Sequence, residues 1–257
     1  SVGKIRQDYK ITLPKTTYPI NGTLTIKEMD ESKGTGNKKT FTITSVPVYE
    51  NTIYKPVLVR GKYSGQEEGE DEDRYWAPVN VGASSTTYSA TVAGCGYYFQ
   101  WGRNVPFVYG SSNNTYGGPV YPETPVEDYE NKFITSASDW LSDPDDGLWS
   151  GDNAQGPCPD GWRVPTAVEL TVLKDKISTI TNCVTISGAV NGEYLYLPVT
   201  GDRSVTGTWA NQSSAGCYWS STVSDTGAIR LLFYGTNMSS VSEFGRASGN
   251  TVRCIQK

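Results

Sequence analysis

Alternating polar and apolar residues recur along the chain and predict β-strands. In the N-terminal part the alternation covers residues 9–13, 23–26 and 41–44, and a period of two places successive side chains on opposite faces of a sheet. Asn and Gly at 21–22 supply a turn. A further strand is expected within residues 54–60, and no helical period appears. These patterns predict a small all-β domain.

Residues 67–73 read Glu-Glu-Gly-Glu-Asp-Glu-Asp. Like charges at this density repel each other and favour water, so the segment is predicted to be an exposed linker. A calcium site is the alternative, because carboxylates suit Ca²⁺, but the ordered spacing of a calcium-binding loop is missing. The composition changes after this segment, and we predict two domains, residues 1–73 and residues 74–257.

One helix is expected in the second domain. Thr166 and Glu169 have the spacing of a capping box, in which each side chain hydrogen-bonds to the backbone of the other residue. Apolar residues follow at helical spacing and predict one buried stripe. The predicted stripe consists of Leu170, Leu173, Ile177 and Ile180. Short strands are expected at 194–198, 216–221, 228–233 and 251–255, and residues 105–156 are predicted to form long loops.

Composition excludes several function classes. The net charge is -5 and the isoelectric point is about 4.9, which argues against binding to nucleic acid. The chain has no histidine, so Ser-His-Asp triads, Cys-His dyads and the usual zinc sites are excluded. Catalysis through carboxylates, lysine or cysteine remains open. No apolar stretch is long enough to span a bilayer.

The chain has five cysteines, and none of them forms a Cys-x-x-Cys pair. A structural zinc site is therefore not expected. Because the number is odd, at least one thiol is free within a monomer. The cysteines are compatible with an oxidising compartment and at most two disulfides.

Four segments, 156–166, 196–203, 218–222 and 246–254, carry the motifs Cys-Pro-Asp-Gly-Trp-Arg-Val-Pro-Thr, Tyr-Leu-Pro, Tyr-Trp-Ser-Ser-Thr and Val-Arg-Cys. In this order they resemble the Fibrobacter succinogenes major paralogous domain, a family related to the formylglycine-generating-enzyme branch of the C-type-lectin-like fold. The likeness covers about residues 75–257. It implies an α+β domain with a small antiparallel sheet, one or two helices and long loops, here preceded by the small all-β domain.

Residues 51–59 are similar to the end of a fimbrillin-type β domain. Together, the two resemblances imply an exported surface protein, extracellular or at the cell surface, either anchored in the outer membrane or fimbrial.

The first resemblance also implies a cysteine pairing. It places Cys158 beside Cys254 and predicts a disulfide between them. A second disulfide, between Cys95 and Cys217, is a weaker hypothesis, and Cys183 is then the remaining thiol.

Several large side chains in these motifs are expected to be structural. We predict that Trp162 and Trp219 lie in the core. Arg203, Arg246 and Arg253 are expected to be buried partners of carboxylates or carbonyl groups rather than ligand contacts.

The densest carboxylate cluster consists of Asp143, Asp145 and Asp146. Its Asp, Pro and Gly residues predict a turn, and calcium binding is the alternative. The Glu-Pro-Asn type of sugar-binding motif is absent. Relatives of the fold include oxidases with a copper-dependent pair of reactive cysteines, and no such pair maps onto this chain. We predict no catalytic residue, no metal site and no cofactor.

The segment 228–249 is the predicted binding surface. Alternation places Leu231 and Phe233 on one face of a strand and an unusual mixture of cationic, aliphatic and aromatic residues on the other. Exposed aromatic and Arg residues among Ser, Gly and Asn are typical of adaptable binding surfaces. The predicted ligand-binding residues are Ile229, Arg230, Leu232, Tyr234, Asn237, Ser239, Ser242, Glu243 and Phe244.

Members of the resembled family usually have Asn and Tyr at many of these positions. Codons for Asn and Tyr are rich in adenine, the base that diversity-generating retroelements randomise, so we hypothesise a diversified surface; ordinary drift of surface loops is the alternative. The predicted function is non-enzymatic adhesion or ligand binding at the cell surface, for example at a pilus tip. The expected partners are host or cell-surface proteins, glycans or fimbrial subunits. The alternatives are a phage receptor-binding variable protein and a formylglycine-generating-type oxidase.

Overall fold

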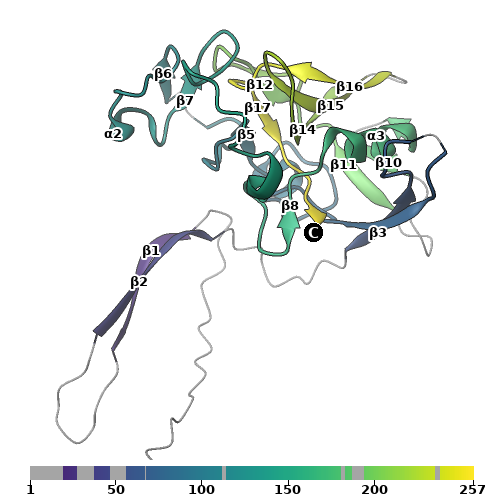
Figure 1. Cartoon of the computed structure of the whole chain (residues 1–257), viewed down its shortest axis with the longest axis horizontal. Coiled ribbons are helices and arrows are strands. Elements are labelled where there is room, and N and C mark those ends of the chain that lie inside the picture. The colour runs from purple at the N-terminus through teal and green to yellow at the C-terminus, as the bar shows by residue number, and fades with distance from the viewer. Residues whose placement is uncertain are drawn as a thin grey trace, which may run out of the picture.

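The computed structural model describes residues 20–27, 38–46, 56–66, 68–111, 114–180, 183–186, 194–234 and 238–257 (Figure 1). The protein is mostly β, with 34% of its residues in strands that form several sheets in a sandwich-like arrangement. In the described part the helices are short: α1 (Val92–Cys95), α2 (Val126–Tyr129) and α3 (Ala167–Asp175). The predicted α+β class, a C-type-lectin-like domain with one or two helices, is therefore wrong. Strand-forming alternation dominates, and of the helices that the structure describes only α3 is longer than one turn.

The largest sheet has seven strands in the order β13-β12-β17-β14-β15-β16, with β5 added beside β17. Neighbours in this sheet are antiparallel, except that β14 and β17 run parallel. Its strands are β5 (Tyr98–Gln100), β12 (Asp202–Arg203), β13 (Trp209–Ala210), β14 (Ala215–Val223), β15 (Ala228–Tyr234), β16 (Met238–Phe244) and β17 (Gly249–Thr251).

The remaining strands form smaller sheets. A four-stranded sheet has the order β3 (Val57–Gly61), β4 (Glu72–Trp76), β18 (Ile255–Gln256) and β8 (Trp162–Arg163). A second sheet joins β11 (Leu195–Pro198), β10 (Cys183–Ile186) and β9 (Ile177–Ile180), and a parallel pair joins β6 (Thr115–Gly117) and β7 (Phe133–Thr135). The antiparallel pair β1 (Ile20–Lys27) and β2 (Lys38–Val46) confirms the two strands expected at 23–26 and 41–44. Residues 9–13 lie outside the described part.

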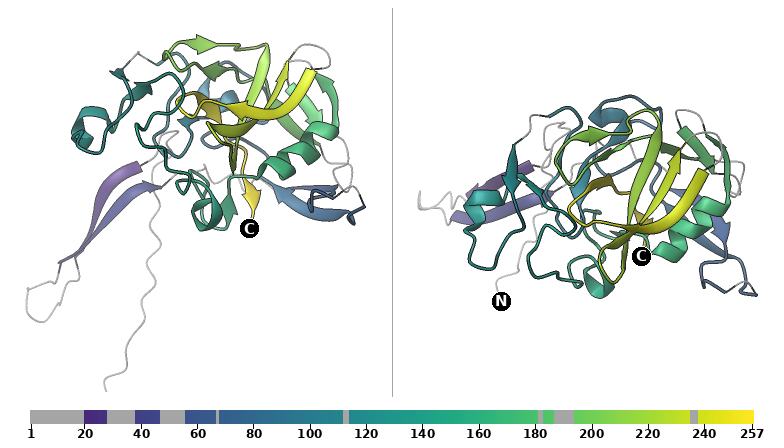
Figure 2. Two further views of the ribbon diagram at one scale, coloured as in Figure 1. Left: turned by 45° about the horizontal axis from the view of Figure 1, so that its top comes forward. Right: turned by 90° about the horizontal axis from the view of Figure 1, so that it is seen from above.

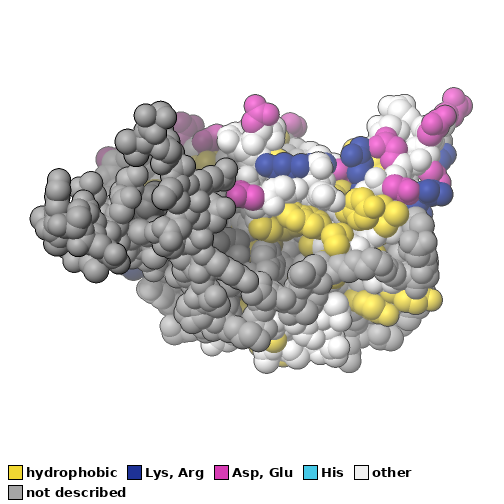
Figure 3. Space-filling view, turned by 90° about the horizontal axis from the view of Figure 1, so that it is seen from below, with side chains coloured by type: hydrophobic (Ala, Val, Ile, Leu, Met, Phe, Trp, Pro, Cys, Tyr) yellow, Lys and Arg dark blue, Asp and Glu magenta, His cyan; other side chains and the backbone are white. Residues whose placement is uncertain are grey.

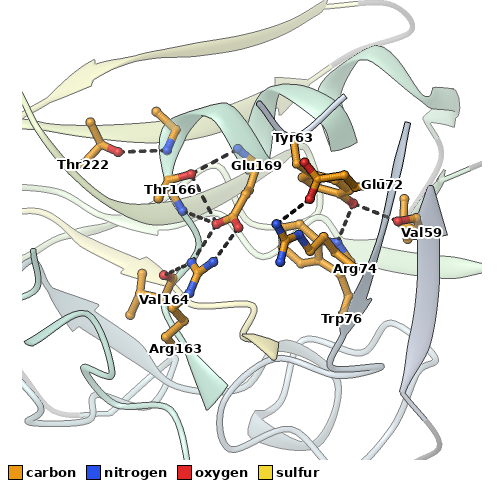
Figure 4. A network of polar contacts seen from close by, with 11 residues as sticks. Val59, Tyr63, Glu72, Arg74, Trp76, Arg163, Val164, Thr166, Glu169 and Thr222 are labelled. Atoms are coloured by element: carbon orange, nitrogen blue, oxygen red, sulfur yellow. Dashed lines mark hydrogen bonds and ion pairs between the residues drawn. The ribbon is translucent and has the colours of Figure 1, made fainter. Parts of the chain in front are cut away.

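The hairpin β3–β4 crosses the predicted domain boundary at residue 73. Val59 is fully buried in the same core cluster as residues of β14 and β15. The Tyr63 hydroxyl donates to the Val59 carbonyl at 3.0 Å, and the Trp76 indole donates to the Tyr63 oxygen at 3.1 Å (Figure 4). Part of the acidic segment thus forms strand β4. On the face shown in Figure 3, acidic and basic side chains lie close to one another, and apolar patches lie to one side of them.

Two layers of side chains hold the main sheet. On one face, α3 contacts β14, β15 and β16 (Figure 2), and its Leu170 and Leu173 pack in one cluster with Tyr218, Leu231 and Phe233. The opposite face carries Trp219 and its neighbours, so β14 is buried on both sides. This double burial makes the centre of the sheet a rigid support for its edges.

Helix α3 confirms the predicted capping box. The Thr166 hydroxyl accepts from the Glu169 N–H, and the Glu169 carboxylate accepts from the Thr166 N–H at 2.7 Å (Figure 4). The same carboxylate pairs with Arg163 at 2.6 Å. The predicted continuation of the stripe to Ile177 and Ile180 is wrong, because these residues form β9 and pair with β10. Their β-branched side chains suit a strand.

The predicted disulfide between Cys158 and Cys254 is confirmed. The hypothesis of a second disulfide is wrong, because Cys95 and Cys217 are buried free thiols. The side chain of Cys183 lies outside the described part. A disulfide indicates an oxidising, extracellular type of environment. None of the helices that the structure describes is long and apolar enough to cross a membrane.

Candidate functional site

The outer strand pair β15–β16 forms one edge of the main sheet (Figure 1). Its register places Leu232 opposite Ser240 and Arg230 opposite Ser242. Because side chains alternate along a strand, Leu232, Tyr234, Ser240 and Ser242 project from the face that α3 does not cover. Tyr234 is 41% exposed and Ser242 is exposed. We call these four residues the open face.

Arg230, which was predicted to be exposed, lies at the inner end of this face and is buried. Its guanidinium donates to the Asn250 side-chain oxygen at 3.0 Å and lies 3.2 Å from the centre of the Phe244 ring. The Asp202 carboxylate is 3.9 Å away. Burial lowers the pKa of Arg230 below its usual value. The interpretation of Arg230 as a surface contact is therefore wrong, because side chains from β12, β16 and β17 surround it.

The other predicted residues do not share this face. Ile229 pairs with Glu243, so both side chains lie on the opposite side of the pair β15–β16. Ser239 pairs with the buried Phe233 and is itself exposed. Asn237 lies outside the described residues. Among the predicted residues that it describes, the structure thus brings five together and places Ile229, Ser239 and Glu243 on the opposite face. The five that share a face are Arg230, Leu232, Tyr234, Ser242 and Phe244.

A hydrogen-bonded turn at residues 211–214 lies beside the open face. The Asp202 carboxylate accepts from the Asn211 amide at 2.8 Å. Asn211 and Ser213 have φ angles of 60° and 62°, which only a few non-glycine residues adopt. Since Ala215 pairs with Tyr234, this tight turn leads directly into the strand beside the exposed tyrosine. The neighbourhood of the open face is therefore fixed by backbone and side-chain bonds.

Cys217 lies beside the open face, opposite Leu232 on the neighbouring strand β14. Burial raises the pKa of the Cys217 thiol to about 12, and burial also raises the pKa of Cys95. Since only the thiolate is a good nucleophile, we expect iodoacetamide at pH 8 to leave both thiols unmodified in the native protein. Peptide mass spectrometry measures the modification. In urea without reductant, both should react while Cys158 and Cys254 stay protected; rapid native labelling of Cys217 would contradict its burial.

The carboxylate cluster at 143–146 has structural partners. The Asp145 carboxylate accepts from the Gly147 N–H at 2.8 Å, which confirms the predicted turn. The Asp146 carboxylate pairs with the buried Arg246. Across the described ranges, no group of three or more Cys, Asp and Glu side chains has the arrangement of a metal site.

Sequence reasoning missed Ser240, which faces the same side as Leu232, and it missed the supporting residues Asp202 and Asn211. The alternation of β16 is the signal that could have placed Ser240. No sequence signal joins Asp202 to Arg230, because β12 has only two residues.

Comparison of the chain with known protein families, with curated proteins and with solved structures finds no match.

Proposed function

We propose that this protein is a non-enzymatic ligand-binding or adhesion module and that the open face, Leu232, Tyr234, Ser240 and Ser242, contacts the ligand. The observation that carries the proposal is an exposed tyrosine among small polar side chains on a strand pair with a rigid base. Tyrosine supplies a large contact area at a small cost in conformational entropy, and serines adapt their hydrogen bonds. A diversified surface at a pilus tip or cell surface is the setting that we propose for this module.

The packing around the face supports this function. Trp219 is fully buried and donates to the Phe99 carbonyl at 2.8 Å, and Ser220 donates to the Ile229 carbonyl at 2.7 Å. Such contacts hold the backbone of β14 and β15 while leaving the outer side chains free to vary. A framework that tolerates change at its surface is what a diversified binding protein requires.

The oxidase alternative receives no support from the two described free thiols. A catalytic cysteine normally has a lowered pKa and some exposure. Cys95 and Cys217 are buried, and burial raises the pKa of each.

Replacing Leu232 and Tyr234 together with Ala should weaken ligand binding about tenfold or more, since a few central aromatic residues carry most of the affinity of an interface. The measurement is a screen of immobilised glycans and host surface proteins, followed by titration of each hit. Arg230 is left intact, because its burial would make a loss of binding ambiguous.

Tyr121→Ala is the matched control, because Tyr121 is 51% exposed in a loop distant from β15 in sequence. The control should bind like the parent, and thermal melting should show that all variants are folded. If the double variant keeps the parent's affinity while Tyr121→Ala loses it, the binding site lies in the loops between residues 105 and 156.

A further inference from the structure

The opposite edge of the main sheet holds a buried cation that lacks a charged partner. Arg203 is 1% exposed, and among the described residues no carboxylate forms an ion pair with it. Its Nε donates to the Gly207 carbonyl at 2.9 Å. Its Nη2 is buried and has no hydrogen-bond partner in the described structure. A buried charge is normally paired, so this arrangement indicates a missing anion.

Three aromatic rings hold the guanidinium in place. The Arg203 Cζ lies 4.2 Å from the ring centre of Phe133, 5.2 Å from Trp209 and 5.4 Å from Phe107. The backbone also approaches closely, because a Cβ on Gly249 would lie 3.1 Å from both Arg203 and Phe133. Cation–π contacts orient the side chain but supply no acceptor for its N–H groups. The guanidinium is therefore fixed in position with donor capacity to spare.

A surface pocket opens onto this cation. Arg203 lines it together with Phe107, Tyr109, Asn114 and Asn131. Of the residues that line this pocket, Arg203 is the one with a charged side chain. Both asparagines are exposed, so amide groups stand at the rim while the cation lies at the buried end. Aromatic walls with a few polar groups are typical of small-molecule sites.

A second buried arginine adds positive charge to the same region. The Arg103 Cζ lies 6.0 Å from the ring centre of Phe107, which also contacts Arg203. Arg103 donates to the Gln100 side-chain oxygen at 2.6 Å and to the Lys132 carbonyl at 3.0 Å. These partners are neutral, and burial lowers the pKa of Arg103 to about 10. The positive charge of both guanidinium groups is thus uncompensated by the described carboxylates.

We propose that this pocket binds the carboxylate group of a small organic ligand, with the Arg203 guanidinium as its anchor. The planar fork of Arg matches the two oxygens of a carboxylate. Phosphate fits less well, because it carries more charge and is usually held by several converging donors. This site lies at the β12–β13 edge, across the sheet from the open face, so it does not depend on the proposed function of that face.

The test uses three carboxylates and a neutral counterpart of each: acetate with acetamide, benzoate with benzamide, and glucuronate with glucose. Thermal melting and calorimetry of the full chain measure binding. We expect at least one carboxylate to raise the melting temperature, its neutral counterpart to have no effect, and inorganic phosphate to bind more weakly. Arg203→Met should abolish the shift. No shift with any carboxylate, an equal shift with the neutral counterpart, or tighter phosphate binding would overturn the proposal.

A second pair of variants keeps the test valid if Arg203→Met does not fold. Asn131 is exposed at the rim, so Asn131→Asp should leave the fold intact and place a like charge near the bound anion. We expect Asn131→Asp to weaken carboxylate binding about tenfold or more, and Asn131→Ala to weaken it by less than about threefold. Equal affinity for all three proteins would place the carboxylate elsewhere and refute the site.

Discussion

Replacing Arg253 with Met should lower the free energy of unfolding by about 3–5 kcal/mol, because it leaves several buried acceptors without donors. Arg253 is 1% exposed. Its guanidinium donates to the Asn80 side-chain oxygen at 2.8 Å and to the carbonyls of Ala77, Pro78 and Tyr196 at 3.2, 3.1 and 2.9 Å. One side chain thus satisfies acceptors from two separate segments of the chain, residues 77–80 and residue 196. Urea unfolding followed by tryptophan fluorescence measures the loss.

Arg74→Met is the matched control for this substitution. The Arg74 side chain is 40% exposed and pairs with Glu72 on the surface, and such pairs contribute about 1 kcal/mol or less. The control should therefore unfold at almost the parent's urea concentration. A loss below about 1 kcal/mol for Arg253→Met would mean that water or other groups satisfy the carbonyls.

Replacing both Cys158 and Cys254 with Ala removes the disulfide. In the chain-entropy model this should lower the free energy of unfolding by on the order of 4 kcal/mol. The bond joins residues 96 positions apart, so it strongly restricts the unfolded chain. Both cysteines are buried in the cluster that contains Trp219. Urea unfolding of the double variant and of the parent protein, both without reductant, measures this loss of stability.

Adding reductant distinguishes the stability that comes from the disulfide from the effect of the changed side-chain packing. It should destabilise the parent protein and leave the double variant unaffected, because Cys95 and Cys217 are already free thiols. An equal effect of reductant on both proteins would show that the stabilisation does not come from the bond between Cys158 and Cys254.

Local patterns predicted the elements that depend on neighbours in sequence. The capping box of α3 is an example, since Thr166 and Glu169 are three residues apart and their bonds need no other segment. Alternation in β15 likewise predicted which face buries Leu231 and Phe233. It failed for Arg230, because its partners Asn250 and Asp202 come from strands that are distant in sequence.

The failures share a physical cause. The isoleucines at 177 and 180 fit a helical stripe as well as a strand, and pairing with β10 decides between the two. In β12, Asp202 and Arg203 point to opposite faces, and a two-residue strand leaves no pattern to detect. The sequence therefore predicted buried arginines, but it could not show that Arg203 lacks the acidic partner that Arg246 has in Asp146.

The position of β18 constrains the order of folding. This strand lies between β4 and β8, so hydrogen bonds join residues near 76 and 163 to residue 255. Neither the four-stranded sheet nor the core around Trp219 is complete before residues 252–256 have been made. Closing such long loops is entropically costly and slow. This domain is therefore expected to fold after its synthesis, in one late cooperative step, rather than segment by segment as the chain emerges.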